Sequence, residues 1–546
     1  MRSKIHLTTS RRRAAIVLAL MLPVLATLPP ASAQKADQKA DEQDAGRQLG
    51  AMHFATSCND IAQRRFDRAM RYQHSFWYRQ SAEIFAEAFT ADPHCAIAQW
   101  GIALSLLNNP HGAPPAPNLP LGLAAIEKAR EIGAKTQRER DYIAALANMY
   151  VDTDKTTHPQ RVQKFLAAMK QLAARYPDDD EAQIALAITL NVAASPADKT
   201  YANQLAGAAI LAPIAERQPQ HPGVWHYLIH LYDYPPIAQK GLDAALRYSK
   251  IAPSAPHAQH MPSHIFTRVG YWKESIESNL ASVNAAKTDK EAGDQLHGTD
   301  YLVYAYLQLA QDEKARAFIA EMAQVALTSP ESPGGHFALA ASPARYAVER
   351  GDWKAASVLA VRPTKFAHVA AITHFARAIG AARSGNPAAG WADAGMLSEL
   401  RDKLAAAKDA YWSAQVDIQW QVASAWLMLA DGKTEAALAL MSDAADAEDK
   451  TEKSPVTPGP LAPARELYGA MLLERGQATE ALAAFEATLA KEPNRYRSIA
   501  GAAAAAEKLG DKAKAKTYFG KLVEQASAST TDRPDLALAR RYMANN

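Results

Sequence analysis

Residues 466–493 read ELYGAMLLERGQATEALAAFEATLAKEP, a pattern typical of two helices joined by a tight turn. Gly476 separates two segments rich in Ala and Leu, which favours a short turn between them. Glu492-Pro493 ends the second segment, because proline cannot continue a helix. Small and aromatic residues stand where the two helices would cross: Tyr468, Gly469, Ala481 and Phe485. The stretch therefore predicts an antiparallel helix pair.

The same pattern recurs along the chain. Gly510 follows Gly476 by 34 residues, the length of a tetratricopeptide (TPR) repeat, and residues 76–103 have a similar arrangement. No sustained alternation of period two predicts a sheet. The predicted fold class is all-α: a TPR-like α-solenoid of antiparallel helix pairs, with a continuous core and a concave groove. Further glycine-centred turns are expected at Gly270, Gly351, Gly385 and Gly432.

Composition shifts divide the chain into five predicted segments. They are a signal peptide (1–33), a flexible lead (34–48), the TPR-like solenoid (49–444), a Pro-rich connector (445–463) and C-terminal TPR repeats (464–546). A second Pro-rich loop, from Pro110 to Pro120, is expected between helices of the solenoid.

The first segment has the order of a secretory signal peptide. Its basic residues end at Arg13, an apolar run extends from Ala14 to Leu28, and small residues lead to cleavage near Ala33. The run is too short to cross a bilayer comfortably and no other stretch is apolar enough, so no membrane span is expected. General secretion and twin-arginine export both remain open. Either route predicts a periplasmic or secreted protein.

The formal net charge of +3 reflects 60 Lys and Arg against 57 Asp and Glu. Five of these basic residues and no acidic residue lie in residues 1–33, so the chain without them carries a net charge of −2. Hydrophobic residues make up 48% and charged residues 21%, which is a globular rather than a disordered composition. Nucleic-acid binding therefore has no compositional support.

Cys58 and Cys95 are the two cysteines of the chain. In an oxidising compartment they favour a disulfide, which the chain-entropy account values at roughly 4 kcal/mol. Two buried free thiols are the alternative. A zinc pair has less support, because the sequence has no Cys-x-x-Cys motif.

Histidines gather between residues 221 and 264, where six of the sixteen stand. His226 and His230 are four residues apart, and so are His260 and His264, so each pair lies on one helix face. The second pair follows the first by 34 residues, one TPR repeat. On adjacent helices the two pairs would aim four imidazoles at one point. Zinc, copper, nickel and iron all accept imidazole nitrogen.

Other residues accompany these four candidate metal ligands. Pro222 and Pro262 suit the first positions of helices. If Pro262 begins a helix, His260 lies outside it and only His264 is rigidly placed. The additional candidate ligands are His221, His257 and His297. The candidate catalytic bases or orienting carboxylates are Asp233 and Asp300.

Two other interpretations of the histidines remain open. In the first, the histidines line the groove and hydrogen-bond a bound peptide. In the second, they pack half-buried against Trp225, Tyr227 and Tyr232. The sequence has no His-Glu-x-x-His motif, so the metallopeptidase mechanism with a glutamate between two histidines is absent.

The histidine-rich stretches read HPGVWHYLIH (221–230) and PHAQHMPSHIFTRVG (256–270). In these residues the chain resembles a family of exported bacterial TPR proteins. Similar stretches also occur at residues 74–78, 92–101, 138–146 and 455–460. The resemblance implies a solenoid fold and an exported location, and it implies no catalytic role.

The sequence thus predicts an extracytoplasmic TPR scaffold that binds a protein or peptide in its groove and carries a His-rich transition-metal site. The alternative prediction is a metal-dependent enzyme, a hydrolase or an oxidoreductase, with the histidine cluster as its active site. Three histidines with an open coordination position would favour the enzyme, and a closed shell of four would favour structure or storage.

Overall fold

Helices of this chain begin and end at residues that can cap them. The Thr136 hydroxyl accepts a hydrogen bond from the Glu139 N–H and the Glu139 carboxylate accepts one from the Thr136 N–H, a capping box before α6 (Gln137–Ala147). At the other end, Gly270 has φ +72° and Gly351 has φ +68°, a conformation that glycine adopts without strain. Glycine-centred turns thus stop one helix before the next begins.

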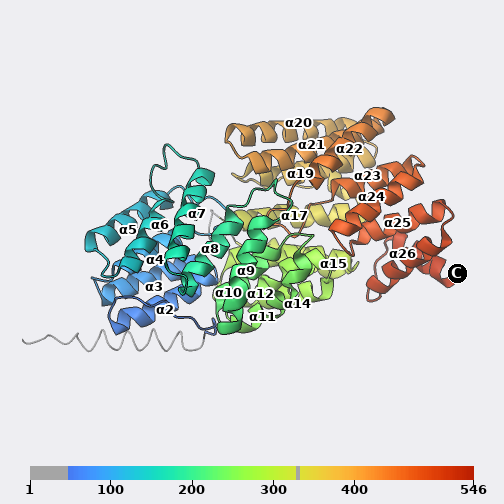
Figure 1. Ribbon diagram of the computed structural model, residues 1–546. Coiled ribbons are helices and arrows are strands. Elements are labelled where there is room, and N and C mark those ends of the chain that lie inside the picture. Colours follow the sequence, from blue (N-terminus) through green and yellow to red (C-terminus); the bar gives the residue numbers. More distant parts are fainter. Residues whose placement is uncertain (1–46, 327–331, 546) are drawn as a thin grey trace, which may run out of the picture. The chain divides into compact units, whose positions relative to one another are not determined.

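The chain is seen here in a computed structural model that describes residues 47–326 and 332–545 (Figure 1). The N-terminal helices are α2 (Asp60–His74), α3 (Tyr78–Ala91), α4 (Ala96–Leu106), α5 (Asn118–Ile132), α6, α7 (His158–Arg175), α8 (Asp180–Val192) and α9 (Ala202–Arg217). The central elements are α10 (Pro222–Tyr232), η1 (Ala238–Gly241), α11 (Leu242–Ile251), α12 (Pro256–His260), α13 (Pro262–Val269), α14 (Trp272–Asp289), α15 (Ala292–Gln308) and α16 (Asp312–Met322).

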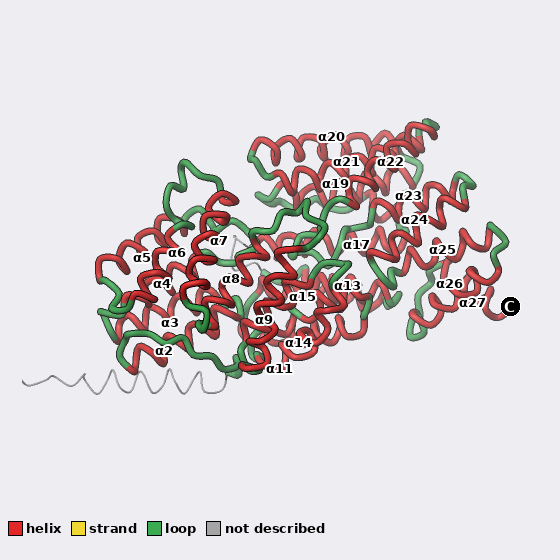
Figure 2. Tube along the Cα trace, viewed as in Figure 1, coloured by secondary structure: helices red, strands yellow, loops and turns green. Residues whose placement is uncertain are grey.

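The C-terminal helices complete the series. They are α17 (Pro333–Arg350), α18 (Trp353–Ser357), α19 (Ala367–Arg383), α20 (Pro387–Ala406), α21 (Ala410–Ala430), α22 (Thr434–Asp449), α23 (Ala464–Glu474), α24 (Ala478–Lys491), α25 (Tyr496–Lys508), α26 (Lys512–Gln525) and α27 (Pro534–Asn545). No strand occurs within the described residues, as Figure 2 shows.

Consecutive helices pack in pairs, and the pairs stack. Within pairs, α2 packs on α3, α14 on α15 and α19 on α20. Between pairs, the first helices of successive pairs contact one another in two series: α8, α10, α13, and α15, α17, α19, α21, α23, α25. Apolar residues between these helices form the core. The predicted all-α, TPR-like α-solenoid is confirmed. In this article the helices of these two series are called the inner helices.

The predicted Pro-rich connector differs from the structure at its N-terminal boundary. α22 continues through Asp449, and the non-helical segment is residues 450–463. Likewise α5 begins at Asn118, so Pro120 lies in its first turn rather than in the preceding loop, because a first-turn proline removes no helical hydrogen bond. The remaining segment boundaries stay predictions.

Part of the connector, residues 452–460, runs across the inner helices, and we call it the strap. The Tyr301 hydroxyl donates to the Thr457 carbonyl oxygen at 3.0 Å, and Arg345 donates to the Pro460 carbonyl oxygen at 2.8 Å. Lys453 reaches Asp233 at 2.9 Å. The strap is therefore hydrogen-bonded to α15 and α17 and ion-paired with the end of α10.

Cys58 and Cys95 form a disulfide, and no free cysteine remains in the described part of the chain. The bond links Cys58, in the segment before α2, to Cys95, the residue that directly precedes α4. It is compatible with an oxidising compartment.

The predicted signal peptide, with its cleavage near Ala33, lies outside the described residues, as does the predicted lead up to residue 46. The last residue of that lead, Gln48, is bonded to the rest of the chain, because its N–H donates to Ser254 Oγ at 2.9 Å. Among the described helices, none has the length and apolar character needed to cross a membrane.

Candidate metal centre

Helices in the middle of the chain carry the clustered histidines, and α10, α13 and α15 among them are inner helices. Pro222 is the first residue of α10 and Pro262 the first of α13, so both predicted first-turn positions are confirmed. α10 places His226 and His230 one turn apart on the same face. Helices α12, α13 and α15 contribute the others: His257, His260, His264 and His297.

His260 is held more firmly than the sequence predicted. It is the last residue of α12, and Met261 keeps helical backbone angles (φ −52°, ψ −38°) between α12 and α13. The His260 Nδ1–H donates to Asn279 Oδ1 at 2.6 Å. The expectation that only His264 would be rigidly placed is therefore wrong, because the helical path continues through residue 261.

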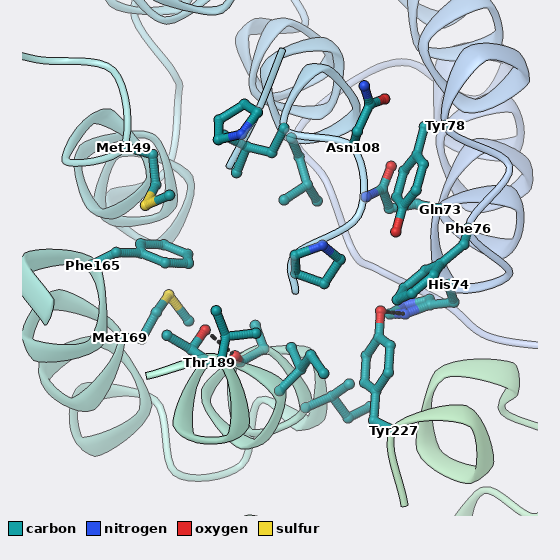
Figure 3. Close-up of a pocket in the computed structure, with 18 of the residues that line it drawn as sticks. Gln73, His74, Phe76, Tyr78, Asn108, Met149, Phe165, Met169, Thr189 and Tyr227 are labelled. Carbon is teal, nitrogen blue, oxygen red and sulfur yellow. Dashed lines mark hydrogen bonds between the residues drawn. The ribbon is translucent and has the colours of Figure 1, made fainter. Parts of the chain in front are cut away.

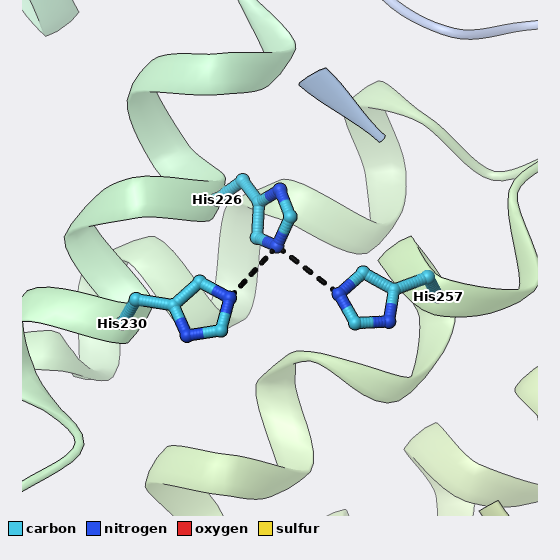
Figure 4. Close-up of side chains that lie close together, drawn as sticks. All are labelled: His226, His230 and His257. Atoms are coloured by element: carbon cyan, nitrogen blue, oxygen red, sulfur yellow. Dashed lines mark hydrogen bonds between the residues drawn. The ribbon is translucent and has the colours of Figure 1, made fainter. Parts of the chain in front are cut away.

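Figure 4 shows a first triad of histidines, His226, His230 and His257. His226 Nε2 lies 3.1 Å from His230 Nε2 and 3.2 Å from His257 Nε2. Two imidazole nitrogens bound to one tetrahedral zinc ion would lie about 3.3 Å apart, given metal–nitrogen bonds of about 2.0–2.1 Å. The separations of His226 Nε2 from the other two nitrogens thus match the spacing of ligands around one metal ion, and all three ligand atoms lie within 4.8 Å of one another.

The first triad also has a fixed tautomer at its centre. His226 Nδ1 lies 2.6 Å from the carbonyl oxygen of His74, which can only accept, so Nδ1 carries the proton and Nε2 of the neutral ring presents a lone pair. That lone pair faces His230 and His257. A ring nitrogen held in this way by a backbone carbonyl is the usual support of a metal-ligating histidine.

A second triad consists of His260, His264 and His297. The Nε2 atoms of His260 and His264 are 3.0 Å apart, and the ring centroids of His260 and His297 are 4.4 Å apart. His264 Nδ1 lies 2.9 Å from Asp233 Oδ2. The second triad therefore repeats the first with an amide and a carboxylate as the outer hydrogen-bond partners.

The triads lie side by side. The ring centroids of His230 and His264 are 6.0 Å apart, and those of His257 and His260 are 6.1 Å apart. The predicted single point with four imidazoles is thus not what the structure shows. Each i,i+4 pair keeps its own contact, and a histidine from another helix completes it.

Burial lowers the pKa of all six histidines below the ordinary value. The pKa of His226 and of His297 falls to about 3, mainly because burial penalises the imidazolium. The pKa of His264 is also lowered by burial, against the opposing effect of Asp233. The other three pKa values lie well below 6.5 for the same reason: those of His230, His257 and His260. All six rings are neutral at pH 7, which is the form that binds metal.

Asp233 orients a histidine and is itself fully engaged. Besides His264 it pairs with Arg268 at 2.8 Å and with Lys453 at 2.9 Å. Although burial opposes ionisation, these two cations hold the Asp233 pKa well below its usual range. A carboxylate in this state is a poor proton acceptor, so the geometry favours the orienting role predicted for Asp233 over the role of a base.

Asp300, the other predicted carboxylate, lies beside Tyr301 rather than in a triad. Ser342 Oγ donates to it at 3.0 Å and the Arg345 guanidinium lies 3.8 Å away. Burial raises the Asp300 pKa, with Arg345 opposing. Its Oδ2 is buried without a hydrogen-bond partner.

A third buried group contains His221, which the sequence analysis included among the candidate ligands. The His221 Nε2–H donates to Glu181 at 2.7 Å, and Nδ1 accepts from the Val224 N–H at 3.4 Å. His74 lies 3.2 Å from the other Glu181 oxygen and 3.0 Å from the Tyr227 hydroxyl. Both nitrogens of His221 are therefore occupied, and we leave it out of the proposed metal centre.

Two residues beside the first triad were missed by sequence reasoning. His111, from the loop between α4 and α5, has its ring centroid 4.4 Å from that of His230, and its Nε2 is buried without a partner. Phe76 has φ +60° and its ring centroid lies 5.0 Å from that of His257. A bulky residue rarely adopts this conformation. Phe76 lies in the stretch 74–78 that carries the family resemblance, and His111 lies in the predicted Pro-rich loop. Neither pattern assigns its residue to the histidine centre, because both residues reach it through loops from another repeat.

Comparisons with known proteins add no family. No protein-family model matches the sequence, and no curated protein matches it. Among solved structures, the chain is similar to the APC/C hetero-tetramer Cut9–Hcn1, at 11% identity with a TM-score of 0.37, covering 94% of this chain and 81% of that one. It is also similar to Naa15/Naa10 bound to HypK-THB, at 11% identity and a TM-score of 0.24, covering 94% and 75%. Scores this low carry no argument, and the exported bacterial TPR family stays a prediction.

Proposed function

We propose that the protein binds transition-metal ions in the two triads. The observation that carries this proposal is the gathering of three imidazoles in each triad. Their Nε2 atoms lie 3.1 and 3.2 Å apart in the first triad, and those of His260 and His264 lie 3.0 Å apart in the second. The Nε2 lone pair of His226 can accept a hydrogen bond from one neighbouring ring, yet the rings of both His230 and His257 point at it. A cation at that point would satisfy all three nitrogens at once.

Because all six proposed ligands are histidines, the bound metal should be an ion that prefers imidazole nitrogen. Zinc, copper, nickel and iron fit six neutral nitrogen donors, whereas calcium and magnesium prefer oxygen. Three histidines per ion leave one coordination position for a further ligand. The neighbouring His111, with an unpartnered nitrogen, could occupy that position in the first triad.

Elemental analysis of the full mature chain tests the metal proposal. We expect up to two bound ions per chain, with His226→Ala and His264→Ala each lowering the metal content. His94→Ala, at an exposed histidine, is the matched control and should leave it unchanged. A metal-free protein that takes up no zinc, copper, nickel or iron in equilibrium dialysis would refute the proposal.

We further propose an extracytoplasmic location and, as a second function, peptide binding along the inner helices. The disulfide between Cys58 and Cys95 supports the location. The strap supports peptide binding, because Tyr301 and Arg345 already hold carbonyl oxygens of a non-helical segment. A partner would then lie along inner helices that the strap leaves uncovered.

The two functions are distinguished by one comparison. A protein partner retained from cell-envelope extract by the mature chain, and retained equally by the His226→Ala/His264→Ala variant, would favour a scaffold. A bound metal without any such partner would favour the alternative, a metal-dependent hydrolase or oxidoreductase. For that enzyme the open coordination position is the supporting feature, since Asp233 is engaged by two cations.

A further inference from the structure

A cavity of about 120 Å³ lies among helices α2, α4, α6, α7 and α8, beside the first triad (Figure 3). The loop between α4 and α5 borders it through Pro110 and Pro114. Phe76 forms part of its wall and also packs against the rings of His226 and His257. The cavity therefore shares one wall with the histidine centre without containing any of the six triad histidines.

The two sides of the cavity differ in chemistry. In Figure 3, Met149, Phe165 and Met169 face it from one side, whereas Gln73 and Tyr78 face it from the other. The first set is made of thioether and aromatic groups, which adapt their packing to a flat or irregular apolar ligand. The second set offers polar atoms at a distance from them.

Hydrogen bonding leaves polar atoms available on that second side. The Tyr78 hydroxyl is buried without a hydrogen-bond partner. Gln73 Oε1 accepts from Ser105 at 2.9 Å and from Ser81 at 3.2 Å, and this fixes the amide so that its nitrogen points into the cavity (Figure 3). A buried hydroxyl without a partner costs free energy unless a ligand or water supplies one.

The cavity offers no free charge to a ligand. Among the described residues, no lysine or arginine lines it, and Glu181, the carboxylate of the lining, is bonded to His74 and His221. Burial also lowers the pKa of His158, which keeps that ring neutral at pH 7. A charged ligand would lose its hydration without gaining a partner, so the cavity selects neutral molecules.

We propose that this cavity binds a neutral, single-ring molecule carrying one hydroxyl or carbonyl oxygen. The ring packs against the side that Phe165 and Met169 form, and the oxygen meets Tyr78 and Gln73. An apolar cavity of about 150 Å³ accommodates benzene, so a cavity of about 120 Å³ limits the ligand to a single ring. The proposal stands independently of the metal centre, since every residue it uses lies outside the triads.

The test measures binding of phenol, benzene and benzoate to the full mature chain by calorimetry and ligand-observed NMR. We expect saturable 1:1 binding of phenol, about tenfold weaker binding of benzene, which lacks the oxygen, and no binding of benzoate. Metal-free and metal-loaded protein should give the same order. Absence of saturable phenol binding, or benzoate binding as tight as that of phenol, would overturn the proposal.

Two variants locate the site. Ala185→Phe places a ring in the cavity that Ala185 lines and should abolish phenol binding, whereas Ala167→Phe, at an exposed alanine of α7, should not. Tyr78→Phe removes only the hydroxyl and should lower phenol affinity to that of benzene. If Ala185→Phe does not fold, the phenol-to-benzene ratio of Tyr78→Phe decides: an unchanged tenfold ratio refutes the assignment.

Discussion

At the residue scale, three of the six triad histidines have the outer ring nitrogen held by a hydrogen-bond partner. A backbone carbonyl holds His226, an amide holds His260 and a carboxylate holds His264. These partners come from α2, α14 and the end of α10. They fix which nitrogen of each of these three rings faces its neighbours, as the proposed metal site requires.

The same burial makes the metal-free protein sensitive to acid. The six triad histidines have folded-state pKa values below the ordinary 6.5, about 3 for His226 and His297. Below pH 6.5 the unfolded chain therefore binds protons that the folded chain does not. Each such histidine lowers the free energy of unfolding by about 1.4 kcal/mol per pH unit, and above pH 7.5 these groups have no effect.

Urea unfolding of metal-free protein at pH 7.5, 6.5 and 5.5 checks this expectation. The urea midpoint of the wild type should fall steeply as the pH is lowered. The midpoint of the His230→Gln variant should fall less steeply, because that variant has one buried imidazole fewer. The His94→Ala control should follow the wild type. Equal midpoints for the wild type at pH 6.5 and 5.5 would contradict it.

At the element scale, the turns between helices are not equivalent, although the sequence makes them look alike. Gly270 and Gly476 both end helices with positive φ, +72° and +80°. A Cβ on Gly270 would lie 2.3 Å from the carbonyl oxygen of Pro493, whereas one on Gly476 would meet nothing within 4 Å. Gly270 thus allows a close contact between two repeats far apart in sequence.

Gly270→Ala should therefore destabilise the protein more than Gly476→Ala. In the Gly476 variant an alanine must adopt a positive φ, which lowers the free energy of unfolding by about 1 kcal/mol. The Gly270 variant must also displace the turn at Pro493, which adds about 1–3 kcal/mol. Thermal unfolding of the two variants side by side measures the difference, and equal losses would show that the contact is dispensable.

Much at this scale could be predicted from the sequence. The glycine and proline punctuation predicts the helix pairs, and both first-turn prolines are where they were expected. The i,i+4 spacing also predicts the Nε2 contacts within each histidine pair. These features are local, so periodicity reveals them.

The partners from other repeats could not be predicted in this way. The contacts that the centre makes with His111, Phe76 and Asn279 depend on how distant segments of the chain pack together, and sequence spacing does not reveal such packing. The third histidine of each triad was only one candidate among several, since His221 has a similar sequence context and lies in a different network. The split of one expected site into two depends on side-chain reach between helices.

At the scale of the whole molecule, the strap joins parts of the chain that stacking alone leaves distant. Repeat proteins gain stability from nearest-neighbour interfaces. Here Lys453 adds an ion pair with Asp233, 220 residues earlier, and Glu452 adds one with Lys199 at 2.8 Å. The first of these pairs is buried and touches the carboxylate that orients His264.

Lys453→Met should lower the free energy of unfolding by about 2 kcal/mol, because it removes one partner of a buried, charged hydrogen bond while Arg268 remains. Its matched control is Lys450→Met, at an exposed lysine of the same connector. Chemical unfolding monitored by circular dichroism compares the two. A Lys453 variant as stable as the control would show that the ion pair contributes nothing.

The strap also sets an order of events during synthesis. The chain is made from its N-terminus, so all six triad histidines and Asp233 exist before Lys453 does. Until residue 453 is added, Arg268 is the one cation, among the residues that the structure describes, that pairs with the carboxylate orienting His264. The second triad therefore reaches its final electrostatic state only when most of the protein has been translated, which ties maturation of the site to completion of the polypeptide.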